Sequence, residues 1–294
     1  MRVTDTLLHN SFLFNMNRSK RALHETQVQL ATQSKINKPS DSPLGSSRVM
    51  RLQTQLGRIG TYNGNISNSL AFIENSISSM EGMQSEIQKV LVDLTSANNA
   101  TVDDSLDTFA SKIDLAISSI MDFANAEFDG RYLFGGTDNS QKPFGYNAAG
   151  DAIETKSSSI DGKQNVRISD NIKQKINISG KELFEDTDIF NTLITVRDNL
   201  ENGIRPTQAE IDKLNNFNDV LLNKMSDAGN ITNRLNDTSE MLINQEMQLS
   251  LLLSEEKDID VAEAVMDLQT QQYNLDLSYK ISSAILPKSL LDYL

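Results

Sequence analysis

The chain has 294 residues, 27 Lys and Arg against 40 Asp and Glu, and a formal net charge of −13. This charge argues against a nucleic-acid coat, which needs clustered cations. The absence of cysteine excludes disulfide scaffolds, thiolate zinc sites and cysteine nucleophiles. No apolar run approaches the ~18 residues of a membrane span, and the first twenty residues lack the apolar core of a signal peptide. The length suits about two domains, and the low apolar share, 38%, favours an elongated or assembly-dependent molecule.

An amphipathic stretch precedes Pro39, with Phe12, Met16, Leu23 and Leu30 on its apolar side. Leu23 and Leu30 are one heptad apart, as in helices that pair. We expect an assembly helix followed by a turn over residues 1–43.

A strict alternation of three- and four-residue steps runs from Val49 to Leu94, and twelve of its fourteen positions are apolar. A sustained 3.5-residue period predicts a coiled-coil-like seam, here roughly 70 Å long. Asn63 and Gln84 interrupt it, either fixing the register from a buried position or lying exposed. Gly57, Gly60 and Gly64 follow the seam, which indicates close approach of a neighbouring helix or subunit, or local packing within one chain.

Further helices are expected over about 106–123 and 188–200, the latter ending before Asn202-Gly203 and Pro206. A second seam runs from Ile211 to Leu253, with nine of thirteen positions apolar. It predicts an antiparallel partner for the first seam. The first half of a rod is therefore expected over residues 44–128 and the second half over residues 187–254.

Between these halves, residues 129–186 are rich in glycine and lack heptads. A short strand over 131–134, a hairpin over 146–155, and period-two runs at 166–168 and 175–178 predict a small antiparallel β insert. The predicted fold class is mainly α: a long antiparallel coiled-coil-like rod with this β domain between its helices.

The last segment, residues 255–294, is expected to form a C-terminal assembly helix that Pro287 ends. The segment from Ser254 places negative charge near its start, at Glu255, Glu256, Asp258 and Asp260, as a helix N-terminus favours. Both ends carry thin apolar stripes, so we expect them to order fully only in an assembly; the alternative is packing onto the rod of the same chain. The residues expected at the assembly interface are Met16, Leu23, Leu30, Val261, Val265, Leu268, Leu275, Tyr279, Leu286 and Leu290.

Signals for catalysis are lacking. His9 and His24 stand among amides and basic residues without a triad-like context, and Asp103 and Asp104 suit a helix start. The run from Gly130 to Gly136 lacks the ending of a phosphate loop. We expect no enzyme, cofactor or metal site.

Several motifs resemble the flagellin superfamily in order and spacing. They are Leu30-Ala-Thr-Gln-Ser-Lys-Ile-Asn-Lys-Pro-Ser-Asp-Ser-Pro43, Phe128-Asp-Gly-Arg-Tyr-Leu-Phe-Gly-Gly136, Asp260-Val-Ala-Glu-Ala264 and Ser289-Leu-Leu-Asp-Tyr-Leu294. Gln33-Ser34 departs from the usual Ser-Gly. The opening Met1-Arg-Val-Thr4, the two prolines, the ending and the short insert are more similar to the hook-associated junction proteins of that superfamily than to flagellin itself.

The resemblance implies an extracellular structural subunit of the bacterial flagellum, which joins the hook to the filament. Implied partners are further copies of the chain in a homo-oligomeric layer, another hook-associated protein, flagellin, and an export chaperone on the C-terminal helix. Nucleic acid and membrane insertion are not among them. Terminal helices would form an inner coiled-coil tube, the insert would face outward, and type III export would need no cleaved signal.

Three alternatives stay open. A divergent flagellin would form the filament body and polymerise alone. A cytoplasmic coiled-coil adaptor would share the heptads but leave the Pro-Ser-Asp-x-Pro turn and the C-terminal motif unexplained. An enzyme housed in the insert is least favoured, because no convergent set of catalytic side chains is present.

Overall fold

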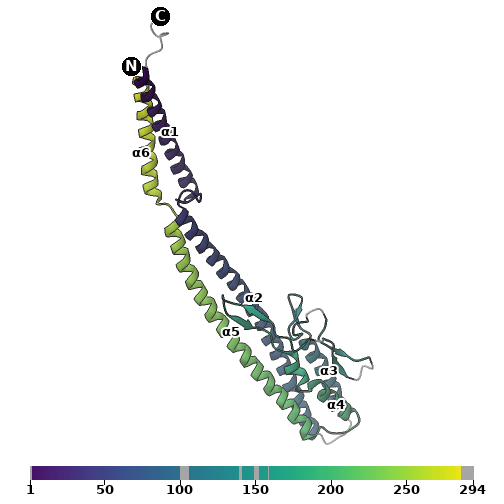
Figure 1. The fold of residues 1–294 in the computed structure, drawn as a ribbon. Coiled ribbons are helices and arrows are strands. Elements are labelled where there is room, and N and C mark those ends of the chain that lie inside the picture. The colour runs from purple at the N-terminus through teal and green to yellow at the C-terminus, as the bar shows by residue number, and fades with distance from the viewer. Residues whose placement is uncertain (1, 100–105, 139–140, 149–151, 158, 286–294) are drawn as a thin grey trace. The chain divides into compact units, whose positions relative to one another are not determined.

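A computed structural model describes residues 2–99, 106–138, 141–148, 152–157 and 159–285. Its long helices and small antiparallel hairpins confirm the predicted fold class (Figure 1). The chain divides into two compact units. One contains residues 1–58 and 244–294, and the other contains residues 59–243. The proposed five-segment division stays a prediction.

The first unit contains the two terminal helices, α1 (Arg2–Thr32) and α6 (Val261–Ile285). It also contains the beginning of α2 (Pro43–Asn99) and the end of α5 (Gln208–Lys257). Local caps explain where two of these helices begin. The Gly45 N–H donates to Ser42 Oγ at 3.1 Å, and the Ala262 N–H donates to Asp260 Oδ1 at 2.9 Å. Glu255 and Glu256, expected near the start of α6, lie instead in the last turn of α5.

The heptads of α2 and α5 form the core of the second unit. On α2 the side chains at every seventh position are at most 4% exposed, and on α5 those at every seventh position are at most 2% exposed. The α2 set is Ile59, Ile66, Ile73, Met80, Ile87 and Leu94; the α5 set is Leu214, Leu221, Ala228, Leu235 and Leu242. Arg205, just before α5, donates to the Asn98 carbonyl at the end of α2 at 2.9 Å. The helices therefore run antiparallel, as predicted (Figure 1).

The polar seam residue Asn63 is not simply exposed: its Oδ1 is buried and has no hydrogen-bond partner among the described residues. The α5 seam residues Asn218 and Thr232 each carry a buried oxygen in the same condition. A buried polar atom without a hydrogen-bond partner lowers the stability of the helix pair that contains it.

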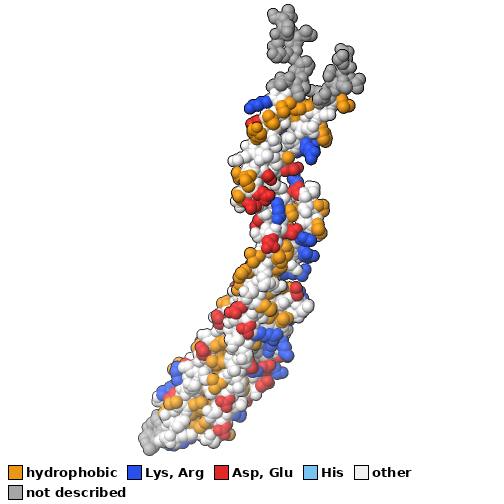
Figure 2. Space-filling view, turned by 90° about the vertical axis from the view of Figure 1, so that its left-hand side faces the viewer, with side chains coloured by type: hydrophobic (Ala, Val, Ile, Leu, Met, Phe, Trp, Pro, Cys, Tyr) orange, Lys and Arg blue, Asp and Glu red, His pale blue; other side chains and the backbone are white. Residues whose placement is uncertain are grey.

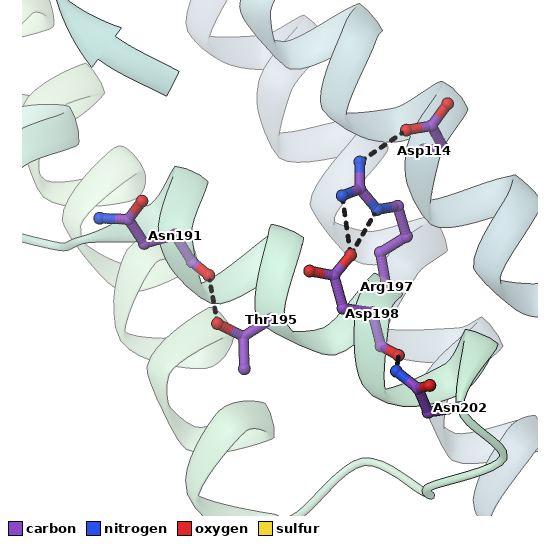
Figure 3. Close-up of polar contacts among 6 residues, drawn as sticks. All are labelled: Asp114, Asn191, Thr195, Arg197, Asp198 and Asn202. Atoms are coloured by element: carbon purple, nitrogen blue, oxygen red, sulfur yellow. Dashed lines mark hydrogen bonds and ion pairs between the residues drawn. The ribbon is translucent and has the colours of Figure 1, made fainter. Parts of the chain in front are cut away.

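Two shorter helices, α3 (Leu106–Ala124) and α4 (Ile189–Glu201), pack together in the second unit, where sequence periodicity placed them. Arg197 on α4 joins them, because it pairs with Asp114 of α3 at 3.1 Å and with Asp198 at 2.7 Å (Figure 3). Burial alone would lower the pKa of Arg197, but the two carboxylates outweigh it and raise that pKa. The C-terminal end of α4 is closed by the Asn202 side-chain amide, which donates to the Asp198 carbonyl.

The strands of the described part of the insert form three separate two-stranded antiparallel hairpins rather than one sheet. β1 (Glu127–Phe128) pairs with β2 (Arg131–Tyr132), and the intervening Asp129 and Gly130 have φ of 53° and 68°. Positive φ at both central residues is the requirement of a two-residue hairpin turn of type I′.

The second hairpin pairs β3 (Phe144–Tyr146) with β4 (Ile153–Thr155), and the third pairs β5 (Asn165–Arg167) with β6 (Lys173–Lys175). The sequence predicted the last strand at 175–178, whereas β6 begins two residues earlier, at Lys173. Residues 176–178 are instead buried next to a π-helix, η2 (Lys181–Glu185), which sequence periodicity does not predict.

An aromatic cluster joins the insert to the helices. Phe184 of η2 is 2% exposed and lies 4.7 Å, centroid to centroid, from the ring of Phe144 in β3. It stacks on Phe190 of α4 at 5.5 Å and lies 6.3 Å from Phe217 of α5. The insert is therefore part of the hydrophobic core of the second unit.

Candidate assembly surface on the terminal helices

The terminal helices α1 and α6 pack side by side, antiparallel, within the first unit (Figure 1). Thr26 Oγ1 lies 3.1 Å from Gln271 Oε1, and the Lys20 ammonium lies 5.5 Å from the centre of the Tyr279 ring. The register set by these two contacts places Leu30 level with Leu268. The seam is narrow: among the side chains of α1 and α6 whose burial is described, Thr26 and Ala264 are the buried ones, at 7% and 5% exposure.

Residues 33–36, which precede the Pro-Ser-Asp-x-Pro motif, form the corner that joins the end of α1 to the end of α5. The Lys35 N–H donates to the Lys257 carbonyl at 2.8 Å, and the Ile259 N–H donates to the Gln33 carbonyl at 3.3 Å. Ser34, 3% exposed, donates through its hydroxyl to the Ile36 carbonyl at 2.9 Å. Backbone of the α1–α2 link is thereby joined to backbone of the α5–α6 link.

Asp41 closes the turn within this corner. Its Oδ2 accepts the backbone N–H of Lys38 at 2.8 Å and that of Asn37 at 3.0 Å. These two hydrogen bonds to the charged form hold the pKa of Asp41 below its ordinary value. The motif that resembles the flagellin superfamily thus has a structural task, which is to form the turn between α1 and α2.

The predicted interface residues fall into three groups. Met16, Leu23, Leu30, Leu268 and Leu275 are half-buried in the unit. Val261, Val265 and Tyr279 are exposed by 50%, 39% and 44%. Leu286 and Leu290 lie outside the described residues. The role of all ten in contacts between subunits stays a prediction.

The structure adds exposed apolar residues that the sequence reading missed. Met266, Tyr273 and Leu277 are exposed by 63%, 67% and 42%. Their spacings of seven and four residues put them on one face of α6, opposite the half-buried Leu268 and Leu275. On α1, Leu7 and Phe14 are likewise one heptad apart and exposed by 68% and 63%. The sequence carries these residues as a second heptad stripe on each helix, separate from the stripe that faces the partner helix.

Figure 2 shows hydrophobic side chains of this unit at the molecular surface, between polar and charged ones. A contiguous exposed apolar face typically marks a contact with another protein. Each terminal helix therefore presents one apolar face to its partner helix and a second apolar face to its surroundings.

Gly57, Gly60 and Gly64 face open space, since a Cβ added at any of them would meet no described atom within 4 Å. Packing within the described chain therefore does not require these glycines. Close approach of a neighbouring helix or subunit stays a prediction.

Of the two histidines, His24 is exposed and the His9 side chain is not described. Among the described residues, no group of three or more His, Asp and Glu side chains could hold a metal ion. In the same residues, no helix has the length and apolar character needed to cross a membrane.

Comparison with known proteins identifies the N-terminal part of the chain. Residues 4–139 match the family model of the bacterial flagellin N-terminal helical region. A search of curated proteins finds no match.

Three solved structures share the fold. A protein described as a flagellar hook-associated protein from Vibrio parahaemolyticus is 17% identical, with a TM-score of 0.66 over 74% of this chain and 100% of that one. Bacillus cereus FlgL is 18% identical, with a TM-score of 0.60 over 69% and 99% of the two chains. The flagellar junction protein FlgL from Legionella pneumophila is 10% identical, with a TM-score of 0.57 over 72% and 100%. Residues 4–139 are therefore similar to the bacterial flagellin N-terminal helical region, and the chain shares the fold of these FlgL and hook-associated structures.

Proposed function

We propose that this chain is a structural subunit of the bacterial flagellum that joins the hook to the filament. Its flagellin N-terminal region and its FlgL-type fold support this role. The observation that carries the mechanism is the second apolar face of α6, formed by Met266, Tyr273 and Leu277.

Burying these side chains against neighbouring subunits would drive assembly. Each large apolar side chain contributes about 1.5–3 kcal/mol when it is moved from water into a packed interface. The α1–α6 pair has a thin seam of its own, so contacts between neighbouring pairs would also stabilise the helices themselves. Assembly and ordering of the ends are thus coupled, and amide exchange in the free chain should be fastest over about residues 1–40 and 255–294.

The partners follow from this role. The subunit assembles with further copies of itself in a layer outside the cell, between another hook-associated protein and flagellin. The chain reaches that place through the flagellar export apparatus without a cleaved signal, and a cytoplasmic chaperone covers the apolar face of α6 before export. The role is mechanical, without a catalytic step or a cofactor.

The test compares two pairs of aspartate substitutions on the same helix. Tyr273→Asp with Leu277→Asp places charges on the outward apolar face, whereas Gln269→Asp with Asn274→Asp adds the same charge at exposed polar positions. Each variant replaces the chain in flagellated cells, and motility and filament attachment are scored. We expect the first variant to shed or lack filaments and the second to swim. Circular dichroism of the purified proteins checks that both variants remain folded.

Normal filaments with the first variant would refute the role of this face. Leu268→Asp with Leu275→Asp, on the side toward α1, is also expected to prevent assembly, because it disrupts the terminal pair itself. Loss of helicity in the purified protein separates that effect from the effect of the outward pair.

A divergent flagellin is the second candidate, because the matching family model is that of flagellin. The discriminating observation is self-polymerisation. Purified chain that grows alone into long filaments is a filament subunit, whereas a junction subunit does not.

A further inference from the structure

One hairpin of this acidic chain carries a local excess of positive charge. Residues 162–181 contain five basic side chains and one acidic one, Asp170, whereas the whole chain has a net charge of −13. The basic residues are Lys163, Arg167, Lys173, Lys175 and Lys181. Asp170 accepts the Tyr62 hydroxyl at 2.8 Å and so anchors the hairpin to α2.

Strand geometry puts four of these cations on one face. Arg167 of β5 stands directly opposite Lys173 of β6, and Asn165 stands opposite Lys175. Lys163 lies two residues before β5, and the Ile176 N–H donates to the Gln164 carbonyl at 3.0 Å, so the pairing continues past the strand and places Lys163 on the face of Arg167. Gln174, on the other face, is 9% exposed. We call the outer face formed by Lys163, Arg167, Lys173 and Lys175 the cationic face.

This face is rigidly held but carries unbalanced charge. The Asn65 amide of α2 donates to the Arg167 carbonyl at 2.8 Å, which fixes β5. Within the described part of the chain, none of the four cations forms an ion pair with a carboxylate. The neighbouring Glu182 is paired with Lys224 instead. Like charges directly opposite each other on two strands are destabilising. Together with the hydrogen bond from Lys224, the charges of Lys175 and Lys163 help to lower the pKa of Glu182, whereas Arg167 and Lys173 stand opposite each other without an ion-pair partner among the described residues.

The same chain carries a complementary surface. From Glu246 to Asp267 there are seven acidic residues and one basic one. Among them, Glu263 and Asp267 of α6 are both exposed and lie one turn apart on one side of the helix. Thr270 lies on the same side.

We propose that the cationic face docks on the acidic side of α6, around Glu263 and Asp267, in a second copy of this chain. The proposal rests on the proposed function, since a layer of identical subunits brings chains of charge −13 into contact. Like-charged subunits repel, and a cationic face opposite an acidic one converts that repulsion into a directed attraction. This contact adds to the apolar contacts of the terminal helices and sets which part of one subunit meets which part of the next.

The absence of cysteine allows a direct test. One version of the full-length chain carries Asn165→Cys and another carries Thr270→Cys, and cells produce both together. Flagella are isolated and treated with a short thiol cross-linker. The proposal predicts a cross-linked dimer that contains one copy of each version. Normal flagella without this dimer overturn the proposal while leaving the proposed function in place.

Charge reversal gives a second readout. Arg167→Glu with Lys173→Glu is expected to lower the cross-linked fraction at least about tenfold, since two attractive pairs become repulsive. Adding Glu263→Lys and Asp267→Lys to the same chain should restore it. The control, Lys213→Glu with Arg234→Glu, changes the net charge equally at exposed positions of α5 and should leave the dimer unchanged.

If the control lost as much of the cross-linked dimer as the hairpin variant, the proposal would be overturned, because net charge alone would then explain the effect. So would failure of the double reversal to restore the dimer while circular dichroism shows folded protein. A chain that never enters flagella, even as wild type, contradicts the proposed function instead.

Discussion

Replacing Phe184 by alanine should detach the insert from the helices of the second unit. Phe184 is 2% exposed, and its ring contacts four others, those of Phe134, Phe144, Phe190 and Phe217. Truncating a buried phenylalanine typically costs about 3–5 kcal/mol, which includes the cavity left behind. The aromatic contacts place this site in the upper half of that range.

The assay is hydrogen exchange of the folded chain combined with urea unfolding. Because the chain has two units, a single unfolding transition cannot be assumed, and exchange reports each segment separately. We expect Phe184→Ala to accelerate exchange in β3, η2 and α4 by at least about a hundredfold, as a loss of about 3 kcal/mol requires. The terminal helices should exchange as in the wild type.

Two further variants complete this experiment. Phe184→Leu keeps most of the volume and should cost about 1–1.5 kcal/mol. Leu115→Ala on α3, where the side chain is 69% exposed, should change the stability by less than about 0.5 kcal/mol. If Phe184→Ala lowered the stability no more than Leu115→Ala, the aromatic cluster would not be the link between insert and helices.

Three other outcomes are expected. Gln33 has φ of 53° where α1 ends, so Gln33→Gly should raise the free energy of unfolding of the first unit by up to about 1 kcal/mol in a urea titration, and a loss would contradict the left-handed geometry. Gly136→Ala should lower the free energy of unfolding by more than about 2 kcal/mol, because φ at this residue is 69° and the new Cβ would lie 2.0 Å from the Ser159 carbonyl oxygen. An unchanged thermal unfolding curve would contradict this expectation. The hydrogen bond from Lys224 lowers the pKa of Glu182 below its ordinary value. This pair therefore stabilises the fold above about pH 4.3, and the stabilisation is lost as pH falls through the lowered pKa. Because the Glu182 side chain is 42% exposed, Glu182→Gln should lower the free energy of unfolding by at most about 1 kcal/mol at pH 7 and leave it unchanged at pH 2.

Periodicity predicted the long helices well, because a heptad repeat reports directly which side of a helix is buried. The seam from Val49 to Leu94 lies within α2, and Leu214, Leu221 and Leu235 of the second seam are fully buried. The insert was harder to predict. Its hairpins have strands of two or three residues, too short for a clear alternation, and residues 176–178 are buried by contacts with neighbouring segments rather than by strand pairing.

The candidate surface was only partly predictable for a similar reason. An apolar residue on an amphipathic helix contacts either the partner helix or another molecule, and the repeat alone does not distinguish the two. The structure separates half-buried Leu268 and Leu275 from exposed Val265 and Tyr279, and it adds Tyr273 and Leu277. The cationic face also needed the strand register, which puts Arg167 opposite Lys173.

The amino-acid order by itself determined the helices, their antiparallel partners and the corner at Pro39 to Pro43, because these depend on local repeats and turn residues. Only the tertiary structure decided which apolar stripe is covered within the chain and which stays exposed. Whether a side chain is buried depends on all the residues that surround it in space, and many of these are distant in sequence.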